Sequence, residues 1–453
     1  MPKDLSPIQT IVVVLMENRS FDHMLGYRNL APLNIAVDGQ QDDPAWKNQV
    51  ANFDKSGQVV EPFHHNNPYS LPKNFDPPHQ RTDVTAHLGV FKGGKYPMDG
   101  FVSNIPDKVS TVPDERRLVM GFFGADEVPM TDFLANNFTI CNRWFSSLPS
   151  GTQPNRLMAM SGMTRIDSNA LPLPPQDLVY DWLDANGISW CVYHQGLPFF
   201  AMMLKWIPRM LLSDNFRSFS QFEKDMTNTP PAKRPKVIFI EPAYGDSPHV
   251  GRCTDDHAPS GVSDGQEFLM QVYNAVIASP SFWKSSVTIV TYDEHGGFFD
   301  HVSPPMVPTD PPATDKYDAF KSLGVRVPAY IISPFVKKGG VVSDVFDHTS
   351  ILKFIAERFG PGGSYSKDVD ARAVESVSTA LDFSAPITFP PSGPHMDAYI
   401  NAVPRPDPLV VEIPPPDTEL RTGFRQAVDE MKRQGAGPDH PKFGAILSQV
   451  PPL

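Results

Sequence analysis

The sequence contains few of the features that define several large classes of protein. It has only three cysteines in 453 residues, Cys141, Cys191 and Cys253. They are too few and too widely spaced for a disulfide framework or a zinc knuckle, so we expect buried free thiols and at most one bridge. The chain has no run of 18 apolar residues, so no membrane-spanning helix is expected. Its 51 acidic residues outnumber 39 basic ones, which argues against nucleic acid as a partner and against a polybasic membrane anchor.

The N-terminal residues also lack the pattern of a signal peptide. They read MPKDLSPIQTIVVVLMENRS, a short apolar run with no small-residue cleavage site after it. We interpret the run as the first core strand. The protein is then expected to be cytoplasmic, or secreted with its signal already removed.

Proline, by contrast, is abundant, with 49 residues in the chain. Much of it falls in four stretches, 62–78, 171–175, 304–312 and 389–416. Because proline has no backbone N–H and fits neither a helix interior nor a central strand, we expect these stretches to be ordered surface loops and crossovers. We expect residues 1–360 to form the main domain. The proline-rich C-terminal segment, 361–453, is expected to pack on this domain or cap it.

Short apolar strands alternate with amphipathic helices along the chain. The predicted strands are 10–16, 188–193, 236–241, 286–292 and 327–333, and the predicted helices include 131–137, 176–186, 264–279 and 349–359. Ser263 is the expected N-cap of the third helix, with Gln266 completing a capping box. This alternation predicts an α/β/α sandwich around a mostly parallel sheet. Ligands of such folds gather beyond the carboxyl ends of the strands.

Two of the predicted strands end in oxygen-bearing side chains. Glu17 and Asn18 follow the strand at 10–16, and Asp293 and Glu294 follow the strand at 286–292. Taken alone, each pair is typical of a polar turn or a helix cap. Together they predict one site for a hard divalent cation, because carboxylate and carboxamide oxygens suit Mg²⁺, Mn²⁺ or Ca²⁺, and Zn²⁺ also accepts such a set.

A tight turn opens another helix at Thr152. Gly151 and Pro154 bracket this residue, and an apolar run follows. A hydroxyl at a helix N-terminus faces free N–H groups, which favours a bound phosphate. If the hydroxyl also contacts the cation, it becomes a nucleophile. The simpler alternative is a plain helix cap.

Histidines occur in several polar segments. His257 follows Asp256 in a loop after the strand at 236–241, where it can bind phosphate oxygens or protonate a leaving alkoxide. His348 is assigned to the start of the helix at 349–359. We expect His64 and His65, in a loop rich in proline and asparagine, to lie at the surface.

Five segments together resemble a known family. They are ENRSFDHMLG at 17–26, PSGTQPNRLMAMSG at 149–162, TDDHAPSGVSDGQ at 254–266, TYDEHGGFFDHVSPP at 291–305 and FDHTSILKFIAERFG at 346–360. They resemble the phosphoesterase family, which contains bacterial phosphatidylcholine-hydrolysing phospholipases C, plant non-specific phospholipases C and a bacterial acid phosphatase. The resemblance implies the fold of the alkaline phosphatase superfamily and makes residues 1–360 a phosphoesterase catalytic domain.

The resemblance also implies roles for individual residues. One divalent cation is expected on Glu17, Asn18, Asp293 and Glu294, with Thr152 as the nucleophile that also contacts it. Asp256 and His257 match the family's Asp-His pair near the phosphate, and His79 matches its early active-site histidine. His301 is a further candidate for the same group of residues. Asn155, inside the 149–162 motif, is a candidate for binding the substrate.

The expected activity is that of a phospholipase C, which acts through a phosphothreonine and meets a membrane surface. Residues 197–212, rich in Phe, Met and Trp, are either a buried amphipathic helix or, if exposed, the lipid contact. One alternative is a soluble phosphatase or phosphodiesterase acting on small phosphate esters. Another is a protein that binds phosphate or lipid without catalysis. The sequence does not indicate an oligomeric state.

Overall fold

The computed structural model describes residues 3–307, 317–402 and 410–452. An eight-stranded sheet runs through its centre in the order β13-β6-β12-β11-β1-β9-β7-β8. In chain order these strands are β1 (Thr10–Met16), β6 (Thr139–Cys141), β7 (Trp190–His194), β8 (Phe216–Ser218), β9 (Val237–Glu241), β11 (Ser286–Tyr292), β12 (Ala329–Ile332) and β13 (Gly340–Val342). The remaining short strands are β2 (Asn52–Phe53), β3 (Val59–Val60), β4 (Phe63–His64), β5 (Gly121–Phe122), β10 (His249–Val250) and β14 (Val411–Glu412).

Within the central sheet, only β12 is antiparallel to its neighbours, β11 and β6. The expected mostly parallel sheet is therefore confirmed. All seven residues of β1 and of β11 are buried, which is why these strands read as continuous apolar runs. The strands β6, β8 and β13 were not predicted. Each has only three residues, which is too short to show a hydrophobic period.

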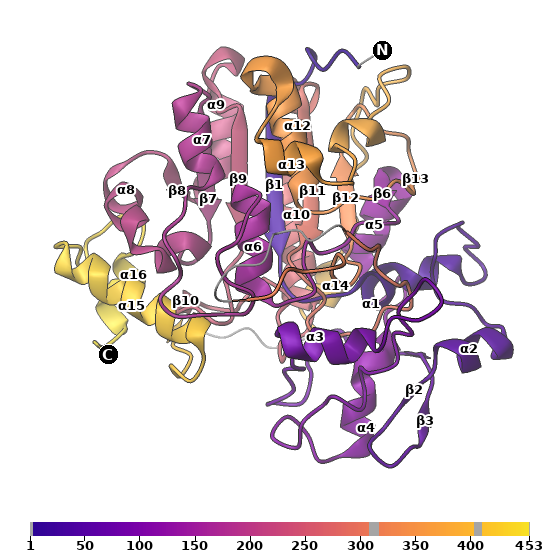
Figure 1. Cartoon of the computed structure of the whole chain (residues 1–453). Helices are drawn as coiled ribbons and strands as arrows, with labels where there is room; N and C mark the ends of the chain where they lie inside the picture. Colours follow the sequence, from indigo (N-terminus) through magenta and orange to yellow (C-terminus); the bar gives the residue numbers. More distant parts are fainter. Residues whose placement is uncertain (1–2, 308–316, 403–409, 453) are drawn as a thin grey trace.

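Helices cover both faces of the sheet, and Figure 1 shows α6 and α12 in front of it and α10 behind. The helices near the sheet are α5 (Pro129–Asn137), α6 (Thr152–Ser161), α7 (Val179–Ala185), α9 (Phe222–Asn228), α10 (Ser263–Ala278), α11 (Pro280–Trp283), α12 (Thr349–Phe359), α13 (Lys367–Ala371) and α14 (Asp397–Ile400). The others are α1 (Phe21–Leu25), α2 (Pro44–Val50), α3 (Arg81–Leu88), α4 (Pro113–Arg116), α8 (Ile207–Leu212), α15 (Glu419–Arg433) and α16 (Gly444–Gln449).

The predicted cap of α10 was wrong. Ser263 is the first residue of the helix rather than its N-cap, and its side chain makes no capping hydrogen bond. Gln266 instead bridges to α5, where its Oε1 accepts from the Thr131 N–H at 2.9 Å and its Nε2 donates to Thr131 Oγ1 at 3.0 Å. The residue that looked like half of a capping box therefore joins two helices.

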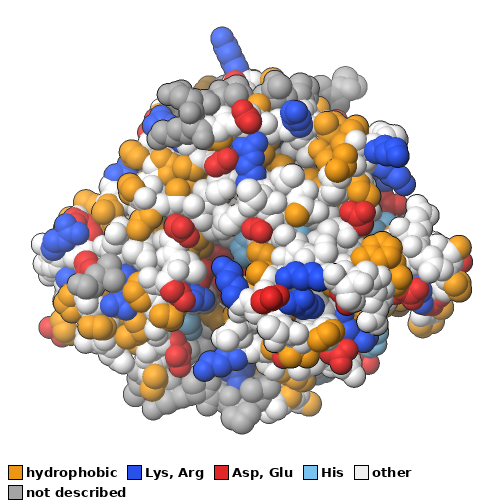
Figure 2. Space-filling view, turned by 60° about the horizontal axis from the view of Figure 1, so that its bottom comes forward, with side chains coloured by type: hydrophobic (Ala, Val, Ile, Leu, Met, Phe, Trp, Pro, Cys, Tyr) orange, Lys and Arg blue, Asp and Glu red, His pale blue; other side chains and the backbone are white. Residues whose placement is uncertain are grey.

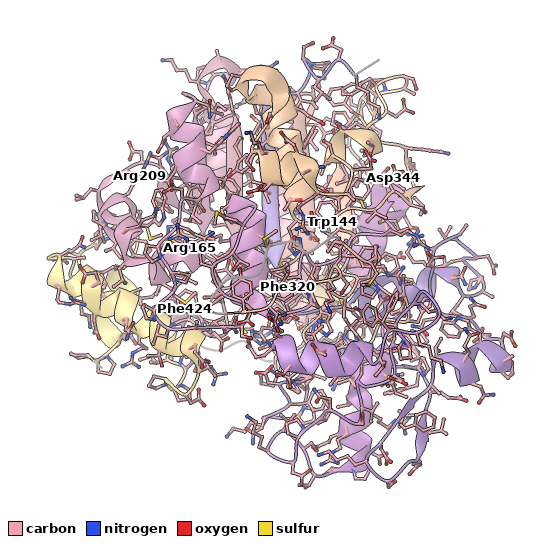
Figure 3. The ribbon with its side chains drawn as sticks, in the orientation of Figure 1. Trp144, Arg165, Arg209, Phe320, Asp344 and Phe424 are labelled. Carbon is pink, nitrogen blue, oxygen red and sulfur yellow. The ribbon has the colours of Figure 1, made fainter. Side chains whose placement is uncertain are left out.

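The C-terminal segment shares the main hydrophobic core. Phe424 of α15, labelled in Figure 3, packs edge-on against Phe199 and stacks on Tyr244. β14 pairs with β10, so the segment also extends a small sheet. Residues 308–312 of the third proline-rich stretch and 403–409 of the fourth lie outside the described residues.

The three cysteines are free, as expected, with Cys141 and Cys191 buried and Cys253 partly buried. Among the helices that the structure describes, none has the length and apolar character needed to cross a bilayer.

Candidate active site

The polar residues that follow β1 and β11 lie side by side because the two strands are parallel neighbours. Met16 pairs with Tyr292 at the end of the register, so Glu17 and Asp293 leave the sheet together. Asn18 adopts a left-handed backbone with φ of 60°, and its N–H donates to Asp293 Oδ1 at 3.3 Å. The lower end of the sheet in Figure 1 therefore holds both predicted pairs of oxygen ligands.

Thr152 is the first residue of α6 and is fully buried. The turn before it is held by Asn155, whose Oδ1 accepts from the Leu148 N–H at 2.9 Å and whose Nδ2 lies 2.8 Å from the Ser150 carbonyl and 3.1 Å from the Gly151 carbonyl. The amide of Asn155 is thus engaged with the backbone of this turn. We expected Asn155 to bind the substrate. Its hydrogen bonds to the backbone instead favour a role in positioning Thr152.

Arg156 joins the helix of Thr152 to both strand ends. Its Nη2 lies 3.0 Å from Glu17 Oε1 and its Nε donates to Asp293 Oδ2 at 3.1 Å. The guanidinium lies between the rings of Phe199 and Tyr244, at 4.5 and 4.9 Å from their centroids. Arg156 stood inside the quoted 149–162 motif without a role, because nothing in the sequence shows which carboxylates a buried arginine meets.

Three oxygens at this site are buried without a hydrogen bond from any described residue, namely Asn18 Oδ1, Thr152 Oγ1 and Glu294 Oε1; a fourth, Glu17 Oε1, has only the ion pair with Arg156. Leaving such an atom unsatisfied costs about 1–3 kcal/mol. A cation would compensate this cost, since all four atoms are hard oxygen donors.

The charge of the group points the same way. The group brings together the carboxylates of Glu17, Asp293 and Glu294, and Arg156 contacts the first two. The residues present therefore fit a divalent cation. Asp293 is the least available of the set, because its Oδ1 also accepts from the Glu294 N–H at 2.8 Å and its Oδ2 is bound by Arg156.

Buried histidines and carboxylates extend the group. Three clusters of the described residues bring possible ligand atoms within 4.8 Å of one another: Glu17, Asp255 and His257; Asp76, His79 and His257; and Asp22, Asp300 and His301. The first two share His257 and adjoin the strand ends. Such clusters suit a divalent metal.

His79 directs one ring nitrogen at the site. Its Nδ1 lies 2.7 Å from the Pro77 carbonyl, which can only accept, so Nδ1 carries the proton. Its Nε2 lies 3.5 Å from Asn18 Nδ2 and 3.8 Å from Glu294 Oε1. Burial alone would lower the pKa of His79, but the carboxylates of Glu294 and Asp76 raise it above its usual value.

His257 lies between the strand ends and the protein surface. Its Nδ1 is 3.1 Å from Glu17 Oε2, and its Nε2 is 3.5 Å from Oδ1 of Asp76, a side chain that is 39% exposed. Burial works against the charged ring, but Asp246, Asp76 and Glu17 raise the pKa of His257 well above its usual value. Figure 2, which brings the lower end of the molecule forward, shows histidine near the centre of that face among acidic and basic side chains.

Asp256 points away from these residues, toward the start of α10. It accepts a 2.6 Å hydrogen bond from the Tyr292 hydroxyl, and burial raises its pKa to about 8. A Cβ on Gly265 would lie 1.9 Å from Asp256 Oδ1, so only glycine fits there. Asp256 is thus placed to support the loop that carries His257.

His301 belongs to a different group. Its Nδ1 donates to Asp22 Oδ2 at 2.7 Å, and Asp22 in turn binds Arg326 at 3.0 Å. The structure gives it no hydrogen bond to the metal-ligand candidates among the described residues, so its place in the catalytic set stays a prediction.

His348 lies closer to the site than the sequence analysis indicated. It precedes α12, and its Nε2 donates to the Asp293 carbonyl at 2.6 Å while its Nδ1 accepts from Trp144 Nε1 at 3.2 Å. Trp144 is labelled in Figure 3. Burial lowers the pKa of His348 to about 4, so a neutral ring holds the backbone of Asp293.

The segment 197–212 buries its aromatic side chains, although Leu212 at its end is 87% exposed. Phe199, Phe200 and Trp206 are each 4% exposed or less. The buried alternative is therefore the correct one for these three residues. His64 is exposed and His65 partly so, close to what we expected.

Comparison with known proteins identifies relatives over most of the chain. The model of the phosphoesterase family matches residues 8–361. Non-specific phospholipase C3 of Arabidopsis thaliana is 33% identical over 421 residues, covering 85% of this chain and 76% of that protein. Non-specific phospholipase C6 from the same plant is 31% identical over 416 residues, covering 86% and 76%. Phospholipase C B of Mycobacterium tuberculosis is 28% identical, covering 89% and 83%.

Solved structures give only a weak likeness. A protein of the alkaline phosphatase superfamily from Vibrio parahaemolyticus is 11% identical, with a TM-score of 0.31 over 51% of this chain and 60% of that one. The family assignment therefore rests on the sequence match, which covers the residues of both strand ends, the α6 turn and the histidines described above. The chain belongs to the phosphoesterase family and is a hydrolase of phosphoester bonds.

Proposed function

We propose that the protein is a metal-dependent phospholipase C, which cleaves glycerophospholipids into diacylglycerol and a phosphorylated head group. The observation that carries the proposal is the group of buried oxygens without hydrogen bonds, Asn18 Oδ1, Thr152 Oγ1 and Glu294 Oε1 with Glu17 Oε1, at the ends of β1 and β11 and the start of α6. The names of the plant and mycobacterial relatives support the choice of substrate.

One divalent cation belongs at this group in the proposal, held by Glu17, Asn18, Glu294 and Thr152, with Asp293 next to it. When bound, such an ion lowers the pKa of a hydroxyl that it contacts and neutralises charge on a phosphate. Arg156 keeps α6 against both strand ends. The Asn155 amide holds the turn from which the Thr152 hydroxyl points.

The reaction proceeds by double displacement. The Thr152 hydroxyl first loses its proton to solvent; its Oγ then attacks phosphorus, and the phosphorus–oxygen bond to diacylglycerol breaks as the new bond forms. The departing oxygen takes a proton from His257 or from His79, whose Nε2 faces Asn18 and Glu294. Water then attacks phosphorus in the Thr152 ester, which still carries the head group, returns a proton to the histidine and releases Thr152 and the phosphorylated head group. Alignment and charge stabilisation supply most of the rate enhancement in reactions of this kind.

A lipid substrate requires contact with a membrane, and we infer that a hairpin after α3 makes it. Val90 is 83% exposed and Phe91 40% exposed. Lys92 and Lys95, both exposed, close the hairpin through a backbone bridge across Gly93 and Gly94. An apolar tip flanked by lysines is suited to a phospholipid surface, where the rings and methyl groups enter and the ammonium groups stay at the phosphates. α3 begins two residues after His79, so this hairpin and the site are joined by one short helix.

The test is product analysis on phosphatidylcholine vesicles supplied with Mg²⁺, Mn²⁺, Ca²⁺ or Zn²⁺. The proposal predicts diacylglycerol and phosphocholine, with activity lost in Thr152→Ala and retained in Thr85→Ala, which alters an exposed threonine of α3. Hydrolysis of p-nitrophenyl phosphate without any attack on the lipid would instead support a soluble phosphatase. If no ester were cleaved with any of these metals, a non-catalytic binding protein would be the better description.

A further inference from the structure

A line of polar side chains, buried at His87 and His295 and partly buried at Asn104 and Asp83, connects α3 to Glu294. His295 Nδ1 lies 3.1 Å from Glu294 Oε2, and His295 Nε2 lies 3.1 Å from His87 Nδ1. On the far side, His87 Nε2 lies 3.2 Å from Asn104 Nδ2. Asn104 Nδ2 also lies 3.3 Å from Asp83 Oδ1. The sequence analysis assigned no role to His87, Asn104 or Asp83, and it quoted His295 only as part of a strand end.

The chemistry of the far end sets the direction of every hydrogen bond in this line. The Asp83 carboxylate can only accept, so Asn104 must turn its NH₂ group toward it. The second hydrogen of that NH₂ group goes to His87 Nε2, which makes Nε2 an acceptor and places the His87 proton on Nδ1. Nδ1 then donates to His295 Nε2. The proton of His295 is thereby left on Nδ1, next to Glu294.

The surroundings favour neutral rings at both histidines. His87 stacks on Phe101 with centroids 4.7 Å apart, and His295 meets the same ring edge-on at 5.9 Å. Both imidazoles are at most 1% exposed. Burial lowers the pKa of His87 well below its usual value. A neutral imidazole has one N–H donor and one nitrogen acceptor. The hydrogen bonds from Asp83 to His295 require this arrangement in both rings.

The two carboxylate oxygens of Glu294 have different surroundings. Oε2 accepts from the Gly296 N–H at 2.8 Å, and His295 Nδ1 lies 3.1 Å from Oε2 without the geometry of a hydrogen bond. Oε1 receives no hydrogen bond from a described residue and lies 3.8 Å from His79 Nε2. The carboxylate is therefore fixed with one oxygen held by the protein and the other directed at the site. Outer residues that orient a ligand in this way commonly change metal affinity by about 10–100-fold.

We propose that Asp83, Asn104, His87 and His295 are positioning residues that hold Glu294 with Oε1 presented to the cation. The inference rests on the proposed function, because it takes Glu294 to be a metal ligand. It adds a set of residues from α3 and the loop after it to a site otherwise built from strand ends and α6. The alternative is a buried histidine pair that contributes only to folding.

The experiment is a titration of metal-free protein with Mn²⁺, followed by calorimetry, on wild type, His87→Phe and His87→Asn. Phenylalanine keeps the stacking on Phe101 but removes the donor to His295, so Mn²⁺ should bind about 10–100-fold more weakly. Asparagine restores an N–H near the position of Nδ1 and should recover part of that loss. The control is His194→Phe. His194 is also buried, stacks on Phe443 and has its pKa lowered to about 4, but it contacts no residue of the line among the described contacts.

Thermal unfolding of each variant separates positioning from folding. The inference predicts that both phenylalanine variants lose stability and that only His87→Phe loses Mn²⁺ affinity. Equal Mn²⁺ affinity in His87→Phe and wild type would overturn it while leaving the metal site intact. Failure of wild type itself to bind Mn²⁺, Mg²⁺, Ca²⁺ or Zn²⁺ would overturn the metal-dependent function, and this inference with it. If His87→Phe does not fold, unchanged affinity in Asn104→Leu would overturn the inference equally.

Discussion

The guanidinium of Arg156 lies 3.0 Å from the carboxylate of Glu17, and both side chains are almost completely buried. Arg156 is one turn beyond Thr152 on α6, and Glu17 is the first residue after β1. This ion pair, together with the contact to Asp293, fixes the proposed nucleophile relative to the proposed metal ligands. It leaves the carboxylate of Glu294, the third of the group, to the proposed cation.

Replacing Arg156 by methionine should impair both stability and activity. The change leaves Glu17 and Asp293 buried without their partner, and breaking a buried ion pair in this way costs about 3–5 kcal/mol. Urea unfolding measures this loss, and steady-state kinetics on p-nitrophenylphosphorylcholine measures the effect on the site. Arg165→Met is the matched control, since Arg165, labelled in Figure 3, is exposed beyond the end of α6. A free energy of unfolding like that of wild type in Arg156→Met would show that the pair does not hold the site together.

Thr152→Ala should abolish turnover with little loss of stability. The Thr152 hydroxyl makes no hydrogen bond within the described structure, so its removal breaks no native contact, whereas losing a nucleophile lowers kcat by about 10³-fold or more. Thr152→Ser keeps the attacking oxygen and should retain measurable activity. Mass spectrometry of acid-quenched reactions with p-nitrophenylphosphorylcholine should detect a phosphocholine ester on residue 152 in wild type and Thr152→Ser. Turnover by Thr152→Ala close to that of wild type would refute the nucleophile assignment.

The hairpin at residues 89–96 should govern binding to lipid vesicles. Changing Val90 and Phe91 to aspartate removes the apolar tip and adds negative charge, so co-sedimentation with phosphatidylcholine vesicles should fall by about tenfold or more. Hydrolysis of the water-soluble p-nitrophenylphosphorylcholine should be unchanged in this variant. Leu212→Asp alters a side chain that is 87% exposed on α8 and serves as the control. Equal vesicle binding by the double variant and wild type would exclude the hairpin.

The pair formed by His301 and Asp22 predicts a pH dependence of stability. Burial opposes the charged imidazole, but Asp22 raises the pKa of His301 above its usual value near 6.5. A raised pKa means that the stabilisation is fully present below about pH 6.5 and is lost as the pH rises through the higher value in the folded protein. His301→Asn should therefore destabilise by about 1–3 kcal/mol near pH 6 and by less near pH 9.

Chemical unfolding of wild type and His301→Asn across this range measures the difference. A constant difference from pH 6 to pH 9 would show that His301 is neutral throughout, contrary to the direction of its pKa.

The strand ends could be predicted from the sequence because each is local. Glu17 and Asn18 directly follow an apolar run, as do Asp293 and Glu294, and the parallel pairing of β1 with β11 brings the two pairs together. The position of Thr152 at the start of a helix was predictable for the same reason, because neighbouring residues determine both the turn and the helix start.

The residues that order the site were not predictable in this way. Arg156 and His348 reach it through contacts with elements far along the chain, and no period or motif shows which partner a buried side chain meets. Gln266 illustrates the opposite error, because a local capping pattern was overridden by its tertiary bond to Thr131. The segment 197–212 was ambiguous, since an apolar helix has the same composition whether it faces the core or a membrane.

The most direct test is a crystal structure of the protein soaked in Mn²⁺, with anomalous scattering recorded at the manganese edge. Our account predicts one strong anomalous peak in contact with Glu17, Asn18, Thr152 and Glu294, and the loss of that peak in Glu294→Ala crystals. A peak confined to Asp22, Asp300 and His301, or no peak at the ends of β1 and β11, would contradict it.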